Sequence, residues 1–144
     1  MDTTNKTTAD IIVEICCGNK DAEGFSHAFL LFCHALDDLI DQDKPIDREA
    51  IIETNINFLM VLAFNPFFQV HKAALMPLVS QAFLSWADSM DWAESGDLEK
   101  EDDSHVIKGG YHSVFFHLAM ICGGWQHGRA ISRKYRKYDH EKEN

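Results

Sequence analysis

The apolar residues of this chain recur with the spacing of an α-helix, and no segment alternates apolar and polar residues with period two. A clear example is the stripe that is formed by Val79, Ala82, Phe83, Trp86 and Met90. Glycine and proline divide the chain into a few long segments of this kind. The sequence therefore predicts an all-α protein in which five to six helices with short connections form a compact bundle.

The composition is that of one globular domain. The 144 residues are 46% hydrophobic and 25% charged, which is enough apolar material for one core. We expect a single helical domain over residues 1–144, with frayed ends at 1–7 and 138–144. No apolar run approaches the roughly 18 residues of a membrane span, and residues 1–10 are polar rather than signal-like. These features predict a cytoplasmic protein without a membrane contact.

The expected helices begin at polar capping residues and end at glycine or before proline. The expected segments are 8–17, 22–42, 48–64, 66–94 and 105–137, and the expected caps of the first four are Thr8, Asp21, Asp47 and Asn65. Pro77 is expected to break or kink the fourth segment, because proline lacks the N–H that a helix interior needs. Residues 97–103 (DLEKEDD) are expected to form an acidic, mobile loop.

The last expected helix contains two glycine pairs. Its apolar face comprises Tyr111, Val114, Phe115, Leu118, Cys122 and Trp125. The pairs Gly109-Gly110 and Gly123-Gly124 each cost helix stability, by about 1 kcal/mol per glycine relative to alanine. They indicate kinks, or places where another helix or a ligand comes close.

The four cysteines are Cys16, Cys17, Cys33 and Cys122, and none belongs to a C-x-x-C pair. Together with the absence of an export signal, this favours small reduced core residues over a zinc site or a disulfide framework.

The most informative segment is 34–41 (HALDDLID). At about 100° per residue, Asp37, Asp38 and Asp41 lie within about 60° of His34 on one strip of a helix. Such a strip is often a plain solvated face. Aspartate, however, is a poor helix former, and like charges at the negative end of a helix dipole repel one another. A cation bound by the aspartates would turn this electrostatic repulsion into attraction. The strip therefore also fits a site for Mg²⁺ or Mn²⁺ formed by the three aspartates, with His34 in support.

Other charged residues form weaker patterns. Asp88, Asp91 and Glu94 lie far around the helix from the apolar stripe, which favours solvent exposure over a second carboxylate pair.

Lys108, Arg129 and Arg133 share one side of the last helix and could bind phosphate, although helix-end charges of this kind also stabilise the dipole. His112, His117 and His127 do not share a face, so we interpret them as core or surface histidines.

The residues Asp37-Asp38-Leu39-Ile40-Asp41 have the D-D-x-x-D form of the first aspartate-rich motif of class I isoprenoid (terpenoid) synthases. The resemblance implies Mg²⁺ bound by these aspartates, a diphosphate substrate, and a reduced form of that helical fold. A longer set of features resembles uncharacterised small phage-encoded helical proteins, and this set implies a phage origin. It adds Asp43-Lys44-Pro45, Asn65-Pro66-Phe67-Phe68, Trp86 and Gly123-Gly124 to the aspartate motif.

Two functions remain open from the sequence. The first is a divalent-metal site at Asp37, Asp38, Asp41 and His34 that binds or acts on a phosphate or diphosphate compound. The second is a non-enzymatic acidic protein that binds a basic host or phage partner. The net charge of −10 argues against direct nucleic-acid binding and favours fast association with basic surfaces. Apolar residues on several helix faces would also allow a homodimer.

Overall fold

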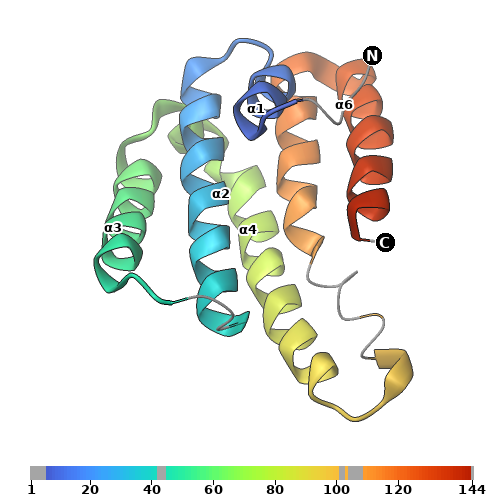
Figure 1. The fold of residues 1–144 in the computed structure, drawn as a ribbon. Helices are drawn as coiled ribbons and strands as arrows, with labels where there is room; N and C mark the ends of the chain where they lie inside the picture. The colour runs from blue at the N-terminus through green and yellow to red at the C-terminus, as the bar shows by residue number, and fades with distance from the viewer. Residues whose placement is uncertain (1–5, 42–44, 101–102, 104–108, 144) are drawn as a thin grey trace.

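The computed structural model describes residues 6–41, 45–100, 103 and 109–143, with the backbone alone for Asp41 and residues 137–143. It confirms the expected all-α class and the helical bundle, and the described residues contain no strand (Figure 1). In chain order the elements are α1 (Thr8–Cys16), α2 (Lys20–Asp41), α3 (Arg48–Phe64), α4 (Pro66–Ala93), the 3-10 helix η2 (Gly109–Tyr111) and α6 (His112–Glu143).

The capping residues of the first two helices lie one and two positions earlier than expected. Thr7, not Thr8, caps α1: its Oγ1 accepts from the Asp10 N–H at 3.2 Å, and its own N–H donates to Asp10 Oδ2 at 3.2 Å. This reciprocal pair satisfies two N–H groups that a helix start otherwise leaves without partners. Asn19 replaces the expected Asp21 at the start of α2, because its Oδ1 accepts from the Ala22 N–H at 3.0 Å.

The boundary between α3 and α4 matches the sequence. Asp47 Oδ1 accepts from the Ala50 N–H, and Asn65 Oδ1 accepts from the Phe68 N–H, with Pro66 at the first helical position. The amide of Asn65 also donates to the carbonyl oxygen of Asp21 at 2.9 Å. One side chain therefore caps α4 and attaches its start to the start of α2.

Of the expected break or kink at Pro77, the break is wrong, because α4 continues through this residue to Ala93. Pro77 removes the hydrogen bond to the carbonyl of the residue four positions earlier, Ala73. Both residues are exposed, so water can satisfy that carbonyl. The helix tolerates proline here because the lost bond faces solvent. The expected loop at 97–103 is also wrong in part: residues 98–100 are helical, and Asp97 Oδ1 accepts from the Glu99 N–H.

Helix α6 is two helices joined at Gly124, which has φ 84° and ψ −179°. This conformation is essentially restricted to glycine. The second half turns back beside the first, and a side chain on Gly128 would lie 2.3 Å from Met120 Cγ. The expected kink at the second glycine pair is therefore confirmed. The first pair precedes α6, which begins at His112 rather than His105; His105 itself lies outside the described residues.

The change of direction at Gly124 corrects one residue of the expected apolar face. Trp125 is 64% exposed, whereas Val114, Phe115 and Leu118 are buried as expected. A periodicity argument assumes one unbroken helix, and the break changes the angular position of every later residue.

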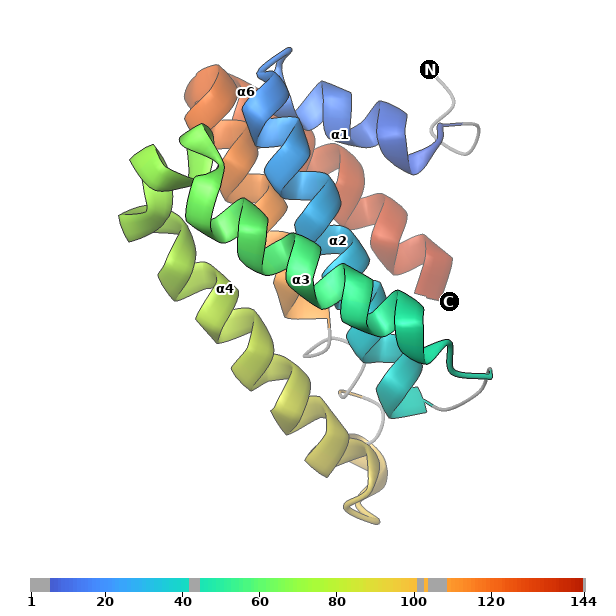
Figure 2. The same ribbon diagram turned by 90° about the vertical axis from the view of Figure 1, so that its left-hand side faces the viewer.

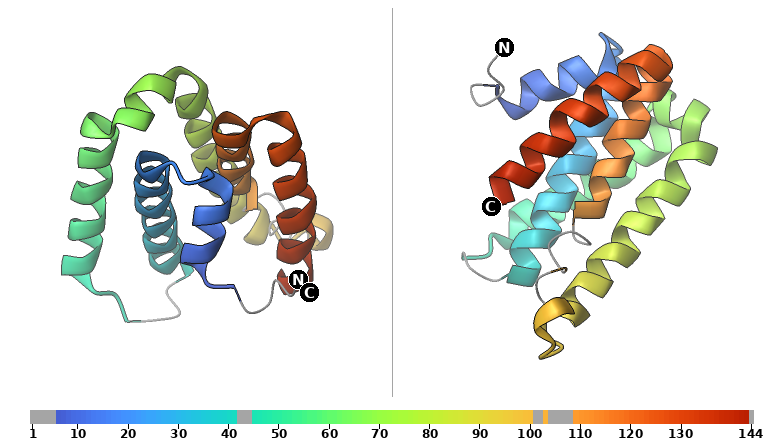
Figure 3. Two further views of the ribbon diagram at one scale, coloured as in Figure 1. Left: turned by 90° about the horizontal axis from the view of Figure 1, so that it is seen from above. Right: turned by 90° about the vertical axis from the view of Figure 1, so that its right-hand side faces the viewer.

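One core joins the helices. Phe25 stacks on Phe68 with ring centroids 5.3 Å apart, and Phe29 contacts both Phe58 and Phe115 at 6.0 and 5.7 Å. Burial of a ring of this size contributes about 2 kcal/mol. Helix α2 carries Phe25 and Phe29 and lies between α3 on one side and the two halves of α6 on the other (Figure 3). Helix α2 is therefore the central element of the bundle.

No single described helix is long and apolar enough to cross a membrane. Helices α3 and α4 meet that criterion only when taken together, and the chain bends by 96° between them.

Candidate functional site

The residues expected to bind metal lie in the last turns of α2. His34 and Asp38 are exposed, Asp37 is half-buried, and Asp41 is the final residue of the helix. His34 and Asp38 are one turn apart and line the same cavity of about 250 Å³ between α2 and the beginning of α3. The structure therefore brings an imidazole and a carboxylate of the predicted set to one opening. The Asp41 side chain lies outside the described part of the structure.

The described side chains do not complete a metal site. Among them, no three His, Cys, Asp or Glu side chains are close enough to hold one ion. Asp47 lines the same cavity as Asp38, but its Oδ1 already caps α3. A site for Mg²⁺ or Mn²⁺ at Asp37, Asp38 and His34 would need Asp41, or water and phosphate oxygens, as further ligands. It stays a prediction.

A second group of carboxylates lies at the same end of the molecule. Asp88, Asp91 and Glu94 are exposed at the end of α4, as expected. Helices α2 and α4 both finish at the lower end of the bundle in Figures 1 and 2, where α3 begins. We call this region the acidic end. Its described acidic side chains are Asp37, Asp38, Asp47, Glu49, Asp88, Asp91, Glu94, Asp97 and Glu99, and its described basic ones are Arg48 and Lys100.

The acidic end is electrostatically unfavourable within the molecule. The carboxyl ends of α2 and α4 carry the partial negative charge of their helix dipoles, and neither has a basic residue in its last turn. Acidic side chains at such positions repel the exposed carbonyl groups as well as one another. A cation from outside the described chain would therefore be stabilised here.

The residues expected to bind phosphate are in a different place. Arg129 and Arg133 are exposed on the second half of α6, on the side of the helix opposite buried Ile131 and Tyr135. This half lies beyond α1 and the first half of α6 as seen from α2 (Figure 3). The structure thus does not bring these arginines to Asp37 and Asp38. Lys108, the third expected phosphate ligand, lies outside the described residues.

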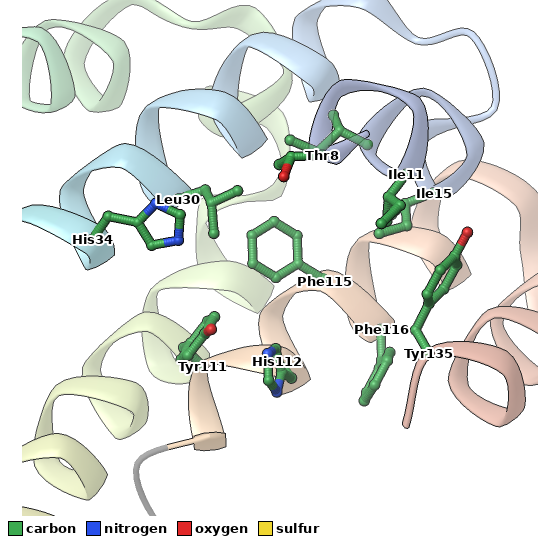
Figure 4. A pocket seen from close by; sticks show the side chains of 11 residues that line it. Thr8, Ile11, Ile15, Leu30, His34, Tyr111, His112, Phe115, Phe116 and Tyr135 are labelled. Carbon is green, nitrogen blue, oxygen red and sulfur yellow. The ribbon is translucent and has the colours of Figure 1, made fainter. Parts of the chain in front are cut away.

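A second cavity, of about 190 Å³, lies between α1, α2 and α6. Figure 4 shows Phe115 at its centre, His34 at one end and Tyr135 at the other. Most of the lining is apolar, with Tyr111 and His112 along one wall. The volume is below the roughly 300 Å³ at which typical ligand pockets begin, so only a small molecule would fit. No sequence pattern indicates this cavity, because its walls come from four separate elements, α1, α2, η2 and α6.

The sequence reasoning also missed a charged network around Glu14. Lys6 Nζ lies 2.6 Å from Glu14 Oε2, Lys134 Nζ lies 2.9 Å from Oε1, and the Tyr135 hydroxyl donates to Oε2 at 2.5 Å. Partial burial alone would raise the pKa of Glu14, but the hydrogen bonds from Lys6, Tyr135 and Lys134 outweigh it and lower the pKa to about 2. Burial and the bond to Glu14 raise the pKa of Tyr135 to about 12.

The network attaches Lys6 and α1 to the second half of α6. No short motif could have revealed it, because Glu14 and Tyr135 are 121 residues apart. The nearest sequence signal is the basic run at 129–137, whose charges fit either stabilisation of the helix dipole or phosphate binding.

The cysteines are free thiols. Cys16 and Cys33 are buried, as a core role predicts, but Cys17 is exposed at the end of α1 and Cys122 is half-buried. Burial raises the pKa of Cys33 and of Cys122 to about 12, which disfavours the reactive thiolate. Cys33 and Cys122 are therefore unsuited to nucleophilic catalysis.

Comparison of the chain with protein-family models, with curated proteins and with solved structures found no match. The phage origin and the resemblance to terpenoid synthases therefore stay predictions.

Proposed function

We propose that this protein is a non-enzymatic binding protein that docks through its acidic end onto a basic surface of a host or phage protein. One observation carries the proposal: helices α2 and α4 finish at the same end of the bundle, where Asp38, Asp88 and Asp91 are exposed, and neither helix has a basic residue in its last turn. A basic partner would replace this repulsion with attraction to both the side chains and the helix dipoles.

An extended partner suits the acidic end better than a single ion does. The carboxylates of α2 and of α4 come from separate helices, and the described residues offer no three-ligand group. A protein surface with several Lys and Arg residues can contact both helix ends at once. The charge of the whole chain, −10, would also accelerate the encounter at low ionic strength.

The proposal can be tested with a fluorescent Lys/Arg-rich peptide as the probe and anisotropy as the readout. We expect binding that weakens steeply as salt is raised. The double variant Asp88→Asn/Asp91→Asn should weaken binding by roughly fivefold, because each exposed charge pair contributes about 0.5 kcal/mol.

The matched control is Asp10→Asn/Asp21→Asn, which removes two exposed carboxylates at the beginnings of α1 and α2, away from the acidic end. It reduces the net negative charge by the same amount and should leave the affinity nearly unchanged. Equal losses in the two double variants would show that only net charge matters, and would overturn a localised docking site. Binding that does not respond to salt would overturn the proposal as well.

The second candidate is a divalent-metal site that acts with a phosphate compound. The observation in its favour is the cavity that His34 and Asp38 share. Thermal unfolding in chelator, then with Mg²⁺ or Mn²⁺, tests it: the wild type should gain stability while Asp38→Asn does not. Asp21→Asn is the control for lost charge. If both variants and the wild type respond equally, the aspartates bind no specific ion.

A further inference from the structure

Helix α3 lies at one edge of the bundle and bears an uncovered apolar stripe. It runs across the front of the molecule in Figure 2, with α2 behind it. The stripe comprises Ile52, Ile56, Leu59 and Ala63, with Met60 and Phe64 along its edge. Ile52, Ile56 and Leu59 are 67%, 53% and 60% exposed. These side chains face solvent, while Phe58 points into the core.

The spacing within the stripe is specific. Successive members are four, three and four residues apart, which is the a/d spacing of helices that pair along a straight seam. Scattered apolar residues on a surface have no such order. The stripe is thus suited to contact another helix over about three turns.

We propose that the stripe is the interface of a homodimer in which α3 packs antiparallel against α3 of a second copy. A two-fold axis near the middle of the helix would place Ile52 against Ala63 of the partner subunit and Ile56 against Leu59 of the partner subunit. The same surface then serves both copies, as an isologous interface requires.

The exposed apolar area supplies more than half of what an interface with a second copy needs. Each large side chain of the stripe and its edge offers on the order of 100 Å² of apolar surface. The five of them therefore supply on the order of 500 Å² per copy, against the roughly 800 Å² per partner of a stable interface. Polar residues that flank the stripe would supply the remainder.

The charges on α3 favour the antiparallel orientation. Arg48, Glu49 and Glu53 all lie in the first half of the helix, and residues 54–64 carry no charge. In a parallel pair, each charged residue would lie beside the same residue of the partner subunit. In an antiparallel pair, each charged residue lies beside the uncharged half of the partner subunit's α3. Antiparallel helix dipoles attract as well.

Sedimentation equilibrium of the full chain tests the dimer. The wild type should have twice the protomer mass of 16.4 kDa, and Leu59→Lys should have the protomer mass. Leu84→Lys is the matched control, because Leu84 is 61% exposed but lies on the second half of α4. It should leave the dimer intact. Circular dichroism checks that both variants fold.

Disulfide trapping tests the orientation. In a Cys17→Ser background, Ile52→Cys/Ala63→Cys should form a covalent dimer on oxidation, while Ile52→Cys alone should not. Crosslinking by Ile52→Cys alone would indicate a parallel pair and overturn the stated geometry.

A wild type that stays monomeric to about 100 µM would overturn the dimer. Monomeric protein that sediments with phosphatidylcholine vesicles would overturn it in favour of a membrane surface.

Discussion

The hydroxyl of Tyr135 donates a hydrogen bond to Oε2 of Glu14 at 2.5 Å and so connects the second half of α6 to α1. Tyr135 is buried, and Lys6 and Lys134 bind the same carboxylate. The contact exists only because α6 reverses at Gly124. The glycine conformation at Gly124 and the half-buried charge network of Glu14 are thus parts of one structural unit.

The Glu14 network should make stability depend on pH in the acid range. The pKa of Glu14 is about 2 in the folded chain and 4.5 ordinarily. A lowered carboxyl pKa means that the contribution is complete above about pH 4.5 and is lost as pH falls through 2. We expect Glu14→Gln to lower the free energy of unfolding by about 2 kcal/mol at pH 7, after allowance for partial exposure.

Chemical denaturation of the wild type and Glu14→Gln at several pH values measures this contribution. The difference between them should shrink from pH 5 toward pH 2. Glu53→Gln, an exposed carboxylate on α3, is the control for charge. A difference that is constant across this range would mean that the network does not stabilise the charged form of Glu14.

Two glycine substitutions should have opposite effects. Gly124→Ala should lower the free energy of unfolding by about 1–3 kcal/mol, because alanine is strained at φ 84° and ψ −179°. Gly24→Ala should raise it by about 0.5–1 kcal/mol, since Gly24 lies within α2 and a new Cβ would meet only Asn65 Nδ2 at 3.6 Å. Denaturant titration of both variants gives the comparison. If Gly124→Ala is as stable as the wild type, the change of direction of α6 at this residue is contradicted.

Pro77→Ala should stabilise the protein by about 1–2 kcal/mol. Alanine restores the hydrogen bond to the Ala73 carbonyl, while the loss of proline's rigidity in the unfolded chain offsets part of the gain. Pro66→Ala, at the first position of α4, should bring no such gain because that N–H has no partner in the helix. The melting temperatures of the two variants and the wild type measure these changes in stability. Equal shifts would mean that the position of the proline within α4 is irrelevant.

Thiol labelling should distinguish the cysteines. Cys17 is exposed and should react first with a maleimide, followed by half-buried Cys122, whereas buried Cys16 and Cys33 should react only on unfolding. Mass spectrometry after short exposures identifies the labelled residue. Early modification of Cys33 would show that the core opens readily in the native state.

The fold class and most helix boundaries followed from local chemistry. Asp47, Asn65 and Pro66 act within one turn of their own positions, so they could be recognised without knowledge of the rest of the molecule. Pro77 and Trp125 show the limit of that reasoning. Whether proline breaks a helix depends on what surrounds the carbonyl it leaves unbonded, and whether Trp125 is buried depends on a reversal one residue earlier.

The candidate site was likewise predictable only in part. Helical periodicity predicted the all-α fold and the aspartate strip on α2, because it depends on residues only a few positions apart. Three relationships could be seen only in the packed molecule: α2 and α4 finish at the same end of the bundle, Arg129 and Arg133 lie away from Asp37, and Glu14 contacts Tyr135. Those relationships depend on the direction of each helix after its turn, and that direction is set by packing between residues far apart in the chain.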